Sequence, residues 1–470
     1  MMEQAVLAEL EPKKVFRFFE ELTRIPHESG NMAAVSGWAA DFARERGLRR
    51  RRDEMGNVVI WKDASPGYED HPAVILQGHL DMVCVKEPGV AHDFARDPLQ
   101  LVLDGDWLRA EGTSLGGDDG AAVALIMALL DDGSISHPPL EAVFTVDEET
   151  GLLGAAGLDC SDLRGRMLIN LDSEDEGVFT VGCAGGARCD LEVTLPVESA
   201  AGAVCTLDLS GLPGGHSGVE IHKDIPNANR VLAECLRALP DARLISLYGG
   251  EQDNAIPDRA RAVFVLPEEQ ADGVAEKLRA LTQGAACSFT RASHSPVNAL
   301  SAEDSRRAVG LILSAPNGVQ TMEPDLPGQV RTSLNLGILR LEEGALRLTW
   351  SVRSSVAAEK EALIQALKDL ADGCGASLSR RGDYPAWAYR PDSVLRDTMV
   401  RAYREQTGKD ATVVTIHAGL ECGLFAEKLP GLDAVSIGPD MRDIHSPRER
   451  LSVSSVQRTW SYLLAVLAQL

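Results

Sequence analysis

The chain has 470 residues, of which 44% are hydrophobic and 25% are charged, and its 46 Lys+Arg and 70 Asp+Glu give a formal net charge of -24. A chain of this length exceeds the usual size of one domain, so we expect two domains. The negative charge repels nucleic acid and anionic membranes, and neither is an expected partner.

The cysteines and the first residues indicate the compartment. Nine scattered cysteines, with no Cys-x-x-Cys, predict reduced and mostly buried thiols rather than a disulfide framework. Met1–Arg24 alternates charged and apolar residues at helical spacing and lacks the apolar segment of a signal peptide. The longest apolar stretch, Ala121–Leu130, is about half as long as a membrane-spanning helix. We therefore expect a soluble cytoplasmic protein.

Residues 1–187 form the first part of a predicted α/β domain. Apolar runs with the character of strands alternate here with helical stretches such as Asn31–Gly47 and Gly120–Leu130. This alternation is typical of a mostly parallel sheet with helices on both faces.

Residues 188–391 have a different character and predict an inserted α+β domain. Strands surround a helix at Pro226–Leu239, and further strands precede a second helix at Ala357–Gly373. This order suggests two related subdomains, although no residue-level repeat is visible. The predicted strands are Cys189–Leu195, Ala203–Leu209, Ala260–Leu266, Val330–Leu341 and Ala345–Val352.

The α/β pattern returns in residues 392–470. A helix at Ser393–Thr407 is followed by strands at Ala411–Ile416 and Ala434–Ile437 and by a helix that runs to Leu470. The second domain is therefore predicted to be inserted into the first.

Five short segments rich in carboxylates and histidines carry the chemistry. Each alone has a simpler explanation, such as a solvated strand end or an exposed acidic turn. Four of them, however, follow apolar strand-like runs, and the carboxyl ends of parallel strands converge on one crevice. Together they offer nitrogen and oxygen donors for two divalent ions that share a ligand, which predicts a metallohydrolase. The segments are His79-Leu80-Asp81, Gly116-Gly117-Asp118-Asp119-Gly120, Asp147-Glu148-Glu149, Leu171-Asp172-Ser173-Glu174 and Asp443-Ile444-His445-Ser446.

The residue types suggest individual roles in this site. Asp118 is the preferred bridging ligand, because its glycine neighbours let the backbone approach a metal closely. His79 and Asp81 flank one apolar residue, so on a strand end they point to the same side and Asp81 can orient the imidazole. The adjacent side chains of Glu148 and Glu149 diverge, so one can be a ligand and the other a general base.

The order of these motifs closely resembles the M20 family of dinuclear zinc peptidases. Four longer strings are similar to its aminoacyl-histidine dipeptidase branch, and the resemblance covers nearly the whole chain. Only the Arg-Gly-Asp-Tyr-Pro-Ala-Trp stretch at 381–387 matches loosely. The four strings are Gly-Leu-Pro-Gly-Gly-His-Ser-Gly (211–218), Asn-Ala-Ile-Pro (254–257), Thr-Ser-Leu-Asn-Leu-Gly (332–337) and Ile-His-Ala-Gly-Leu-Glu-Cys-Gly (416–423).

The resemblance implies a ligand set and a base. Zn²⁺ is the expected metal, with Co²⁺ or Mn²⁺ as alternatives, and two ions are expected. Glu148 would be the general base, and Asp81 is counted with it among the catalytic residues as the partner that orients His79. One ion would be held by His79, Asp118 and Asp172, and the other by Asp118, Glu149 and His445.

The resemblance also implies substrate contacts from the inserted domain. His216 would stabilise the oxyanion, often across a dimer interface, although a turn histidine is the simpler explanation. Asn254 would contact the substrate carbonyl. Arg353 would bind the terminal carboxylate with its fork of donors, against the alternative of an ion pair on the sheet surface.

The expected function is hydrolysis of dipeptides, with a C-terminal histidine in carnosine-like Xaa-His substrates, by a homodimer whose inserted domain acts as a lid. An M20-type aminoacylase or other deacylase and a tripeptidase are alternatives with the same metal core. A metal-dependent binding protein without turnover is a third alternative. A metal-storage or scaffolding protein is also considered, but it would not need Glu148 beside a metal ligand.

Overall fold

The computed structural model describes residues 6–292 and 296–470. The chain divides into two compact units: unit 1 comprises Met1–Gly182, Tyr389–Thr415 and Leu420–Leu470, and unit 2 comprises Cys183–Ala388 and Ile416–Gly419. These limits lie three to five residues before the predicted boundaries at 187/188 and 391/392. In addition, the short 416–419 segment, predicted as part of the first domain, belongs to unit 2.

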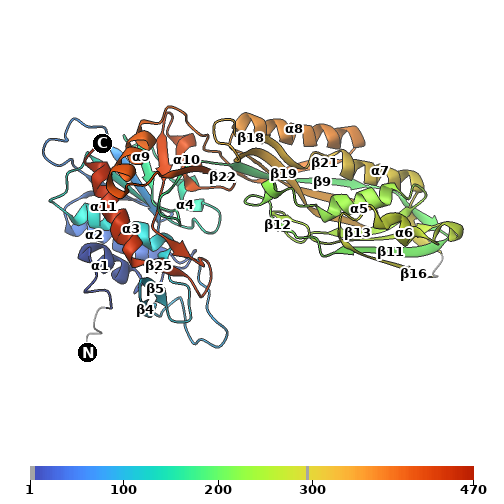
Figure 1. Cartoon of the computed structure of the whole chain (residues 1–470), viewed down its shortest axis with the longest axis horizontal. Helices are drawn as coiled ribbons and strands as arrows, with labels where there is room; N and C mark the ends of the chain where they lie inside the picture. The colour runs from blue at the N-terminus through green and yellow to red at the C-terminus, as the bar shows by residue number, and fades with distance from the viewer. Residues whose placement is uncertain (1–5, 293–295) are drawn as a thin grey trace. The chain divides into compact units, whose positions relative to one another are not determined.

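An eight-stranded sheet forms the centre of unit 1, in the order β1-β2-β6-β3-β7-β23-β8-β22. Figure 1 labels β22, the strand at one edge of this sheet. Its middle strands β6, β3, β7 and β23 are parallel, whereas β1, β2 and β8 join antiparallel. The prediction of a mostly parallel sheet therefore holds for the four central strands only. The strands beside them pair antiparallel, and an antiparallel pair such as β1 and β2 needs only a short connection, here residues 53–57. The strands are β1 Arg49–Arg52, β2 Val58–Lys62, β3 Val74–His79, β6 Leu140–Thr145, β7 Met167–Asn170, β8 Val178–Cys183, β22 Thr412–Ile416 and β23 Asp433–Ser436.

The apolar runs of the sequence become the most deeply buried elements of unit 1. Every residue of β3 and β6 is buried, as expected for strands covered on both faces. Helix α3 is buried from Gly117 to Leu130, since its Ala121–Leu130 stretch carries no polar side chain, and it packs against α1 and β3. The helices are α1 Lys13–Leu22, α2 Ala33–Glu45, α3 Gly117–Asp131, α4 Leu153–Gly157, α9 Val394–Thr407, α10 Glu421–Lys428 and α11 Val453–Leu467.

A four-stranded sheet in unit 1 was not predicted, because its strands are too short for a periodic pattern. The sequence predicts helical spacing over Met1–Arg24. Within this stretch the structure has helix α1 at Lys13–Leu22, and residues 1–5 lie outside the described part of the chain. No helix among the described residues has the length and apolar character needed to cross a membrane. The small sheet has the order β24-β25-β5-β4, with β4 Leu101–Asp104, β5 Trp107–Ala110, β24 Met441–Arg442 and β25 Arg450–Ser452.

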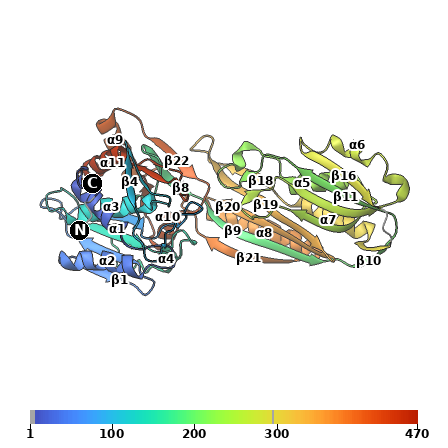
Figure 2. The same ribbon diagram turned by 90° about the horizontal axis from the view of Figure 1, so that it is seen from below.

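Unit 2 contains a nine-stranded sheet in the order β16-β11-β15-β13-β19-β20-β9-β21, with β18 paired to β19. Figure 2 shows β19, β20, β9 and β21 side by side. The two predicted subdomains are joined in this one sheet, where β13 pairs with β19. The strands are β9 Gly185–Thr194, β11 Ala203–Ser210, β13 Arg243–Gly249, β15 Ala260–Leu266, β16 Ala286–Ala292, β18 Gly318–Met322, β19 Val330–Glu342, β20 Ala345–Ser354 and β21 Ser377–Tyr384; the short pairs are β10 Val197–Ala200 with β17 Val297–Leu300 and β12 Gly215–His216 with β14 Ala255–Ile256.

Alternating burial gives the sheet of unit 2 one apolar face. In β11, for example, Cys205, Leu207 and Leu209 are buried and belong to the same core as residues of the helices. Asn227 starts the first helix by accepting hydrogen bonds from the backbone N–H groups of Asn229 and Arg230. The helices are α5 Ala228–Arg237, α6 Val274–Arg279, α7 Ala302–Ser314 and α8 Ala357–Cys374.

Candidate metal centre

The carboxyl ends of neighbouring parallel strands bring the predicted ligands of unit 1 together. His79 ends β3, Glu148 and Glu149 follow β6, and Asp172 follows β7. Asp118 reaches the same place from the start of α3, and His445 from a loop after β24. The convergence expected from a parallel sheet is therefore present.

Asp118 lies between two imidazole rings. Its Oδ1 is 3.1 Å from Nε2 of His79, and its Oδ2 is 3.2 Å from Nε2 of His445. Asp172 Oδ1 lies 3.7 Å from Nε2 of His79, and Glu149 Oε1 lies 2.7 Å from Nε2 of His445. The donor atoms of each predicted trio are within 4.8 Å of one another. The two trios thus share one carboxylate, with one of its oxygens facing each histidine.

Glu148 also lies beside these groups. His79, Glu148 and Glu149 form a third set of donor atoms within 4.8 Å of one another. The geometry alone therefore allows Glu148 to be a ligand as well as a base, and a variant that separates metal content from turnover is needed to distinguish the two roles.

Asp81 connects His79 to the acidic segment after β6. Its Oδ1 accepts a hydrogen bond from the backbone N–H of Glu148 (3.0 Å), and its Oδ2 accepts from the N–H of Glu149 (3.2 Å) and from the hydroxyl of Ser29 (2.8 Å). Nδ1 of His79 is 3.0 Å from the main-chain carbonyl oxygen of Asp81 and 3.5 Å from its carboxylate. The nearest partner of the imidazole is therefore the carbonyl, whereas the sequence suggested the carboxylate.

The electrostatics of the centre fit a bound cation. Burial raises the pKa of Glu148 to about 9, and the nearby acids Asp172, Glu421 and Glu149 add to the rise that His79 opposes. Burial likewise raises the pKa of Asp172 to about 7. Carboxylates crowded together in a buried place destabilise each other's charged forms, and a divalent cation among them removes that penalty. The charged forms of these buried carboxylates are therefore more stable with a divalent cation bound among them than without one.

The predicted substrate contacts His216, Asn254 and Arg353 all lie in unit 2. Strand β12 pairs His216 with Ala255, next to Asn254. Nδ1 of His216 accepts hydrogen bonds from the backbone N–H groups of Gly218 (3.2 Å) and Val219 (3.1 Å). Burial, assisted by Arg353, lowers the pKa of His216. The neutral ring therefore carries its proton on Nε2, which leaves that nitrogen as a donor.

Arg353 is a buried residue of β20, with 8% of its surface exposed. Its Nη1 donates to the hydroxyl of Tyr384 at 3.0 Å and lies 3.5 Å from the carbonyl oxygen of His417. No ion pair of Arg353 exists within the described part of the chain, so the alternative of an ion pair on the sheet surface is wrong. Tyr384 was not predicted, because it lies in the stretch that matched the family only loosely.

His417 gives unit 2 a sensitivity to acid. It is 8% exposed, and its Nε2 lies 2.7 Å from the hydroxyl of Ser333. Burial, assisted by Arg353, lowers the pKa of His417 from 6.5 to about 3. Between these two values the unfolded chain binds a proton at this site that the folded chain does not bind. The contribution of His417 to the free energy of unfolding therefore decreases as the pH falls below 6.5, by up to about 1.4 kcal/mol per pH unit.

His417→Gln is expected to remove this contribution. The free energy of unfolding of metal-stripped protein, measured from pH 6.5 to 4, should fall less steeply in the variant than in the parent chain. Ser333→Ala is the matched control, since it removes the hydrogen bond but keeps the titrating ring, and it should retain the parent slope. Parallel curves for His417→Gln and the parent chain would contradict the assignment.

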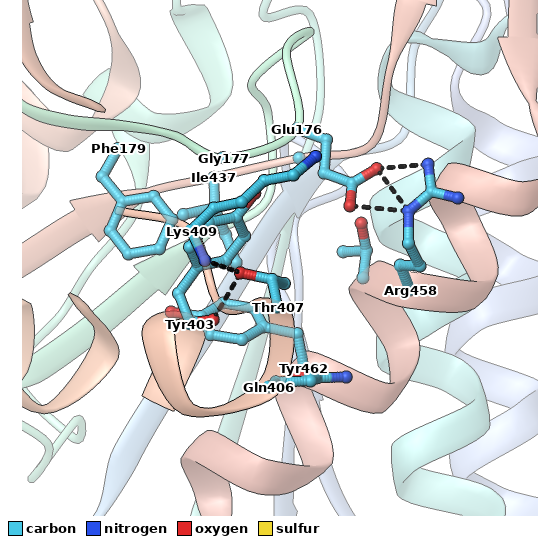
Figure 3. A pocket seen from close by; sticks show the side chains of 12 residues that line it. Glu176, Gly177, Phe179, Tyr403, Gln406, Thr407, Lys409, Ile437, Arg458 and Tyr462 are labelled. Carbon is cyan, nitrogen blue, oxygen red and sulfur yellow. Dashed lines mark hydrogen bonds and ion pairs between the residues drawn. The ribbon is translucent and has the colours of Figure 1, made fainter. Parts of the chain in front are cut away.

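A separate cavity of about 270 Å³ lies in unit 1 (Figure 3). The rings of Phe179, Tyr403 and Tyr462 line it, and none of its lining residues is a predicted site residue. Arg458 points to Glu176 there, with Nη2 2.7 Å from Oε2. Because these opposite charges satisfy each other, we assign no ligand to this cavity.

Comparison with known proteins identifies the chain's relatives. It is 34% identical to cytosol non-specific dipeptidase of Escherichia coli (strain K12), over 99% of both chains. The crystal structure of aminoacylhistidine dipeptidase from Vibrio alginolyticus matches with a TM-score of 0.94 and 35% identity, and covers 99% of this chain and 98% of that chain. A tripeptidase from Staphylococcus aureus matches with a TM-score of 0.57, 16% identity and 98% of each chain, which shows a shared fold alone. The model of peptidase family M20/M25/M40 matches residues 75–469, and the chain therefore belongs to this family.

Proposed function

We propose that this protein is a metal-dependent dipeptidase. The observation that carries the proposal is the pair of donor trios that share Asp118, with Glu148 beside them. The names of two relatives that match nearly the whole chain support dipeptides as substrates. One is called non-specific and the other acts on aminoacylhistidines, so Xaa-His dipeptides are included among the proposed substrates.

Two divalent ions are proposed to bind at the centre, with Zn²⁺ as the preferred ion. His79, Asp118 and Asp172 would hold one, and Asp118, Glu149 and His445 the other. When bound, the ions would supply Lewis-acid polarisation of the peptide carbonyl and a water of lowered pKa.

The chain's own residues then move the protons. Glu148 takes a proton from the attacking water and later delivers it to the amine of the leaving amino acid. Asp81 keeps Glu148 and Glu149 in place through their backbone N–H groups. A cation near Glu148 favours its deprotonated form, which a base requires, and so opposes the rise in pKa that burial causes.

Unit 2 is proposed to act as a lid that supplies the substrate contacts. His216 would donate from Nε2 to the developing oxyanion, Asn254 would contact the carbonyl, and Arg353 would bind the terminal carboxylate. We also propose a homodimer and a cytoplasmic location; the cytosolic name of the Escherichia coli relative supports the location.

A kinetic panel tests this function. Dipeptides with and without C-terminal histidine, tripeptides and N-acyl amino acids would be compared at equal enzyme concentration, before and after removal of metal with a chelator. We expect metal-dependent turnover of dipeptides and much lower kcat/KM for the other two classes. Preferred hydrolysis of tripeptides or N-acyl amino acids would favour the related peptidases and deacylases. No turnover by metal-loaded protein would favour a binding protein.

His216→Ala is expected to lower kcat by about 10²–10³-fold, the usual effect of removing one donor to an oxyanion. KM should change less, because the donor acts mainly in the transition state, and metal content should stay at the parent value. Steady-state kinetics together with metal analysis measures these effects. An unchanged kcat would leave His216 as the turn histidine of the simpler explanation.

Mixing experiments decide whether His216 acts across a dimer. If it does, inactive Glu148→Ala and His216→Ala protomers should regain part of the activity when mixed, since one site of the mixed dimer then has an intact base and an intact donor. Two His216→Ala preparations mixed in the same way are the control. No recovery after confirmed subunit exchange would place His216 in its own subunit's site or outside the mechanism.

A further inference from the structure

Glu449 is a buried carboxylate of unit 1, with 3% of its surface exposed, and it follows His445 by four residues. Its two oxygens accept hydrogen bonds from four successive backbone N–H groups. Oε2 accepts from Leu115 (2.7 Å) and Gly116 (3.0 Å), and Oε1 accepts from Gly117 (2.8 Å) and Asp118 (3.2 Å). One side chain thus holds the whole turn that presents Asp118.

The turn needs this partner. Asp118 and Asp119 have non-helical φ and ψ angles, so the N–H groups of residues 115–118 precede the regular part of α3 and do not belong to its hydrogen-bond ladder. Buried backbone N–H groups need an acceptor, and a carboxylate suits the place because hydrogen bonds to a charged acceptor are strong. Glu449 therefore caps this turn from a distant part of the chain.

The two glycines before Asp118 fit the same arrangement. Gly116 has a φ of 68°, in the left-handed region that glycine adopts most readily. A Cβ atom at Gly117 would lie 3.2 Å from Oε1 of Glu449. In the structure, Gly116 sets the turn and Gly117 makes room for Glu449.

The segment from His445 to Glu449 is fastened to Asp118 twice. Nε2 of His445 lies 3.2 Å from the Asp118 carboxylate, and Glu449 binds the Asp118 backbone N–H. The segment 445–449 therefore sets the positions of both Asp118, the shared ligand, and His445, a neighbouring ligand.

We infer that Glu449 is a positioning residue of the metal centre: it fixes the turn at 115–118 so that the Asp118 carboxylate faces both metal positions. The inference rests on the proposed function, because it requires that the two trios bind metal. Glu449 touches none of the reacting groups, and it acts through Asp118.

A purely structural cap is the competing explanation, and the chain contains a matched control for it. Glu141 is also 3% exposed, and its oxygens accept from the backbone N–H groups of Arg164 (2.9 and 3.0 Å) and Gly165 (2.9 Å). It lies near the start of β6, whereas the metal centre lies beyond the end of that strand. Loss of Glu141 should weaken the fold without a specific effect on metal.

The test compares Glu449→Gln with Glu141→Gln in the full-length chain. Glutamine keeps the volume but replaces one acceptor oxygen with an NH₂ group that faces backbone donors. Dissociation constants for Zn²⁺ would be measured by competition with a chelator, and Co²⁺ absorption would report the ligand geometry. We expect Glu449→Gln to weaken metal binding by about 10–100-fold, the usual effect of losing a residue that orients a ligand, and to change the Co²⁺ spectrum. Glu141→Gln should leave both unchanged.

Two further measurements keep the test decisive if Glu449→Gln folds poorly. Glu449→Asp retains the charge and should bind Zn²⁺ more tightly than Glu449→Gln. In the parent chain, the amide protons of residues 115–118 should be protected from hydrogen exchange even after metal is removed.

Parent-like metal affinity in Glu449→Gln, an equal loss of affinity in both glutamine variants, or unprotected amides at 115–118 would each overturn the inference. Failure of the parent chain to bind either ion would instead overturn the proposed function.

Discussion

Glu148→Gln is expected to lower kcat by about 10²–10⁴-fold or more while both metal ions stay bound. The reason is that Glu148 is proposed to be the base and not a ligand, and glutamine has nearly the same shape but cannot accept the proton of the attacking water. Metal content by elemental analysis, measured on the same preparation as the kinetics, separates the two roles.

Glu149→Gln is the matched control for this result. The two glutamates are adjacent and both lie among the donor atoms of the centre, but only Glu149 is within hydrogen-bonding distance of His445, at 2.7 Å. Glu149→Gln should therefore weaken metal binding together with activity. If Glu148→Gln also lost an ion in parallel with its activity, Glu148 would have to be reassigned as a ligand.

Asp118→Asn is expected to weaken both metal positions at once. Each carboxylate oxygen faces a different histidine, and the amide of asparagine cannot serve two cations with two anionic oxygens. Removal of a shared ligand should cost more than the about 10–100-fold typical of residues that only orient ligands. Titration of metal-free protein with Zn²⁺ or Co²⁺ measures the effect at both positions.

Thermal unfolding gives an independent measure of the same change. Metal that binds only the folded chain adds about 4.1 kcal/mol to its stability at 1,000 times the dissociation constant, and this contribution should be mostly lost in Asp118→Asn. Asp172→Asn is the control, because Asp172 belongs to one trio only and its loss should weaken one position. Two ions bound at parent affinity in Asp118→Asn would refute the shared-ligand assignment.

The sequence determined much of the framework of this protein. Continuous apolar runs predicted the central strands and α3, because elements buried on both sides can carry no polar face. The ends of those runs also carried the candidate ligands, since parallel strands bring their carboxyl ends to one edge. The order of the motifs then predicted the M20 family, which the match over residues 75–469 confirms.

Only the tertiary structure decided how the ligands are held. It showed that His79 lies closest to the main-chain carbonyl of Asp81, and that the turn before Asp118 is capped by Glu449, 331 residues further along the chain. The 416–419 segment likewise joined unit 2 against the expectation from its place in the chain. Such contacts involve backbone N–H and carbonyl groups. Every residue type provides these groups alike, except that proline has no N–H. They leave no pattern of side chains in the sequence, so only the folded chain reveals which distant residue satisfies them.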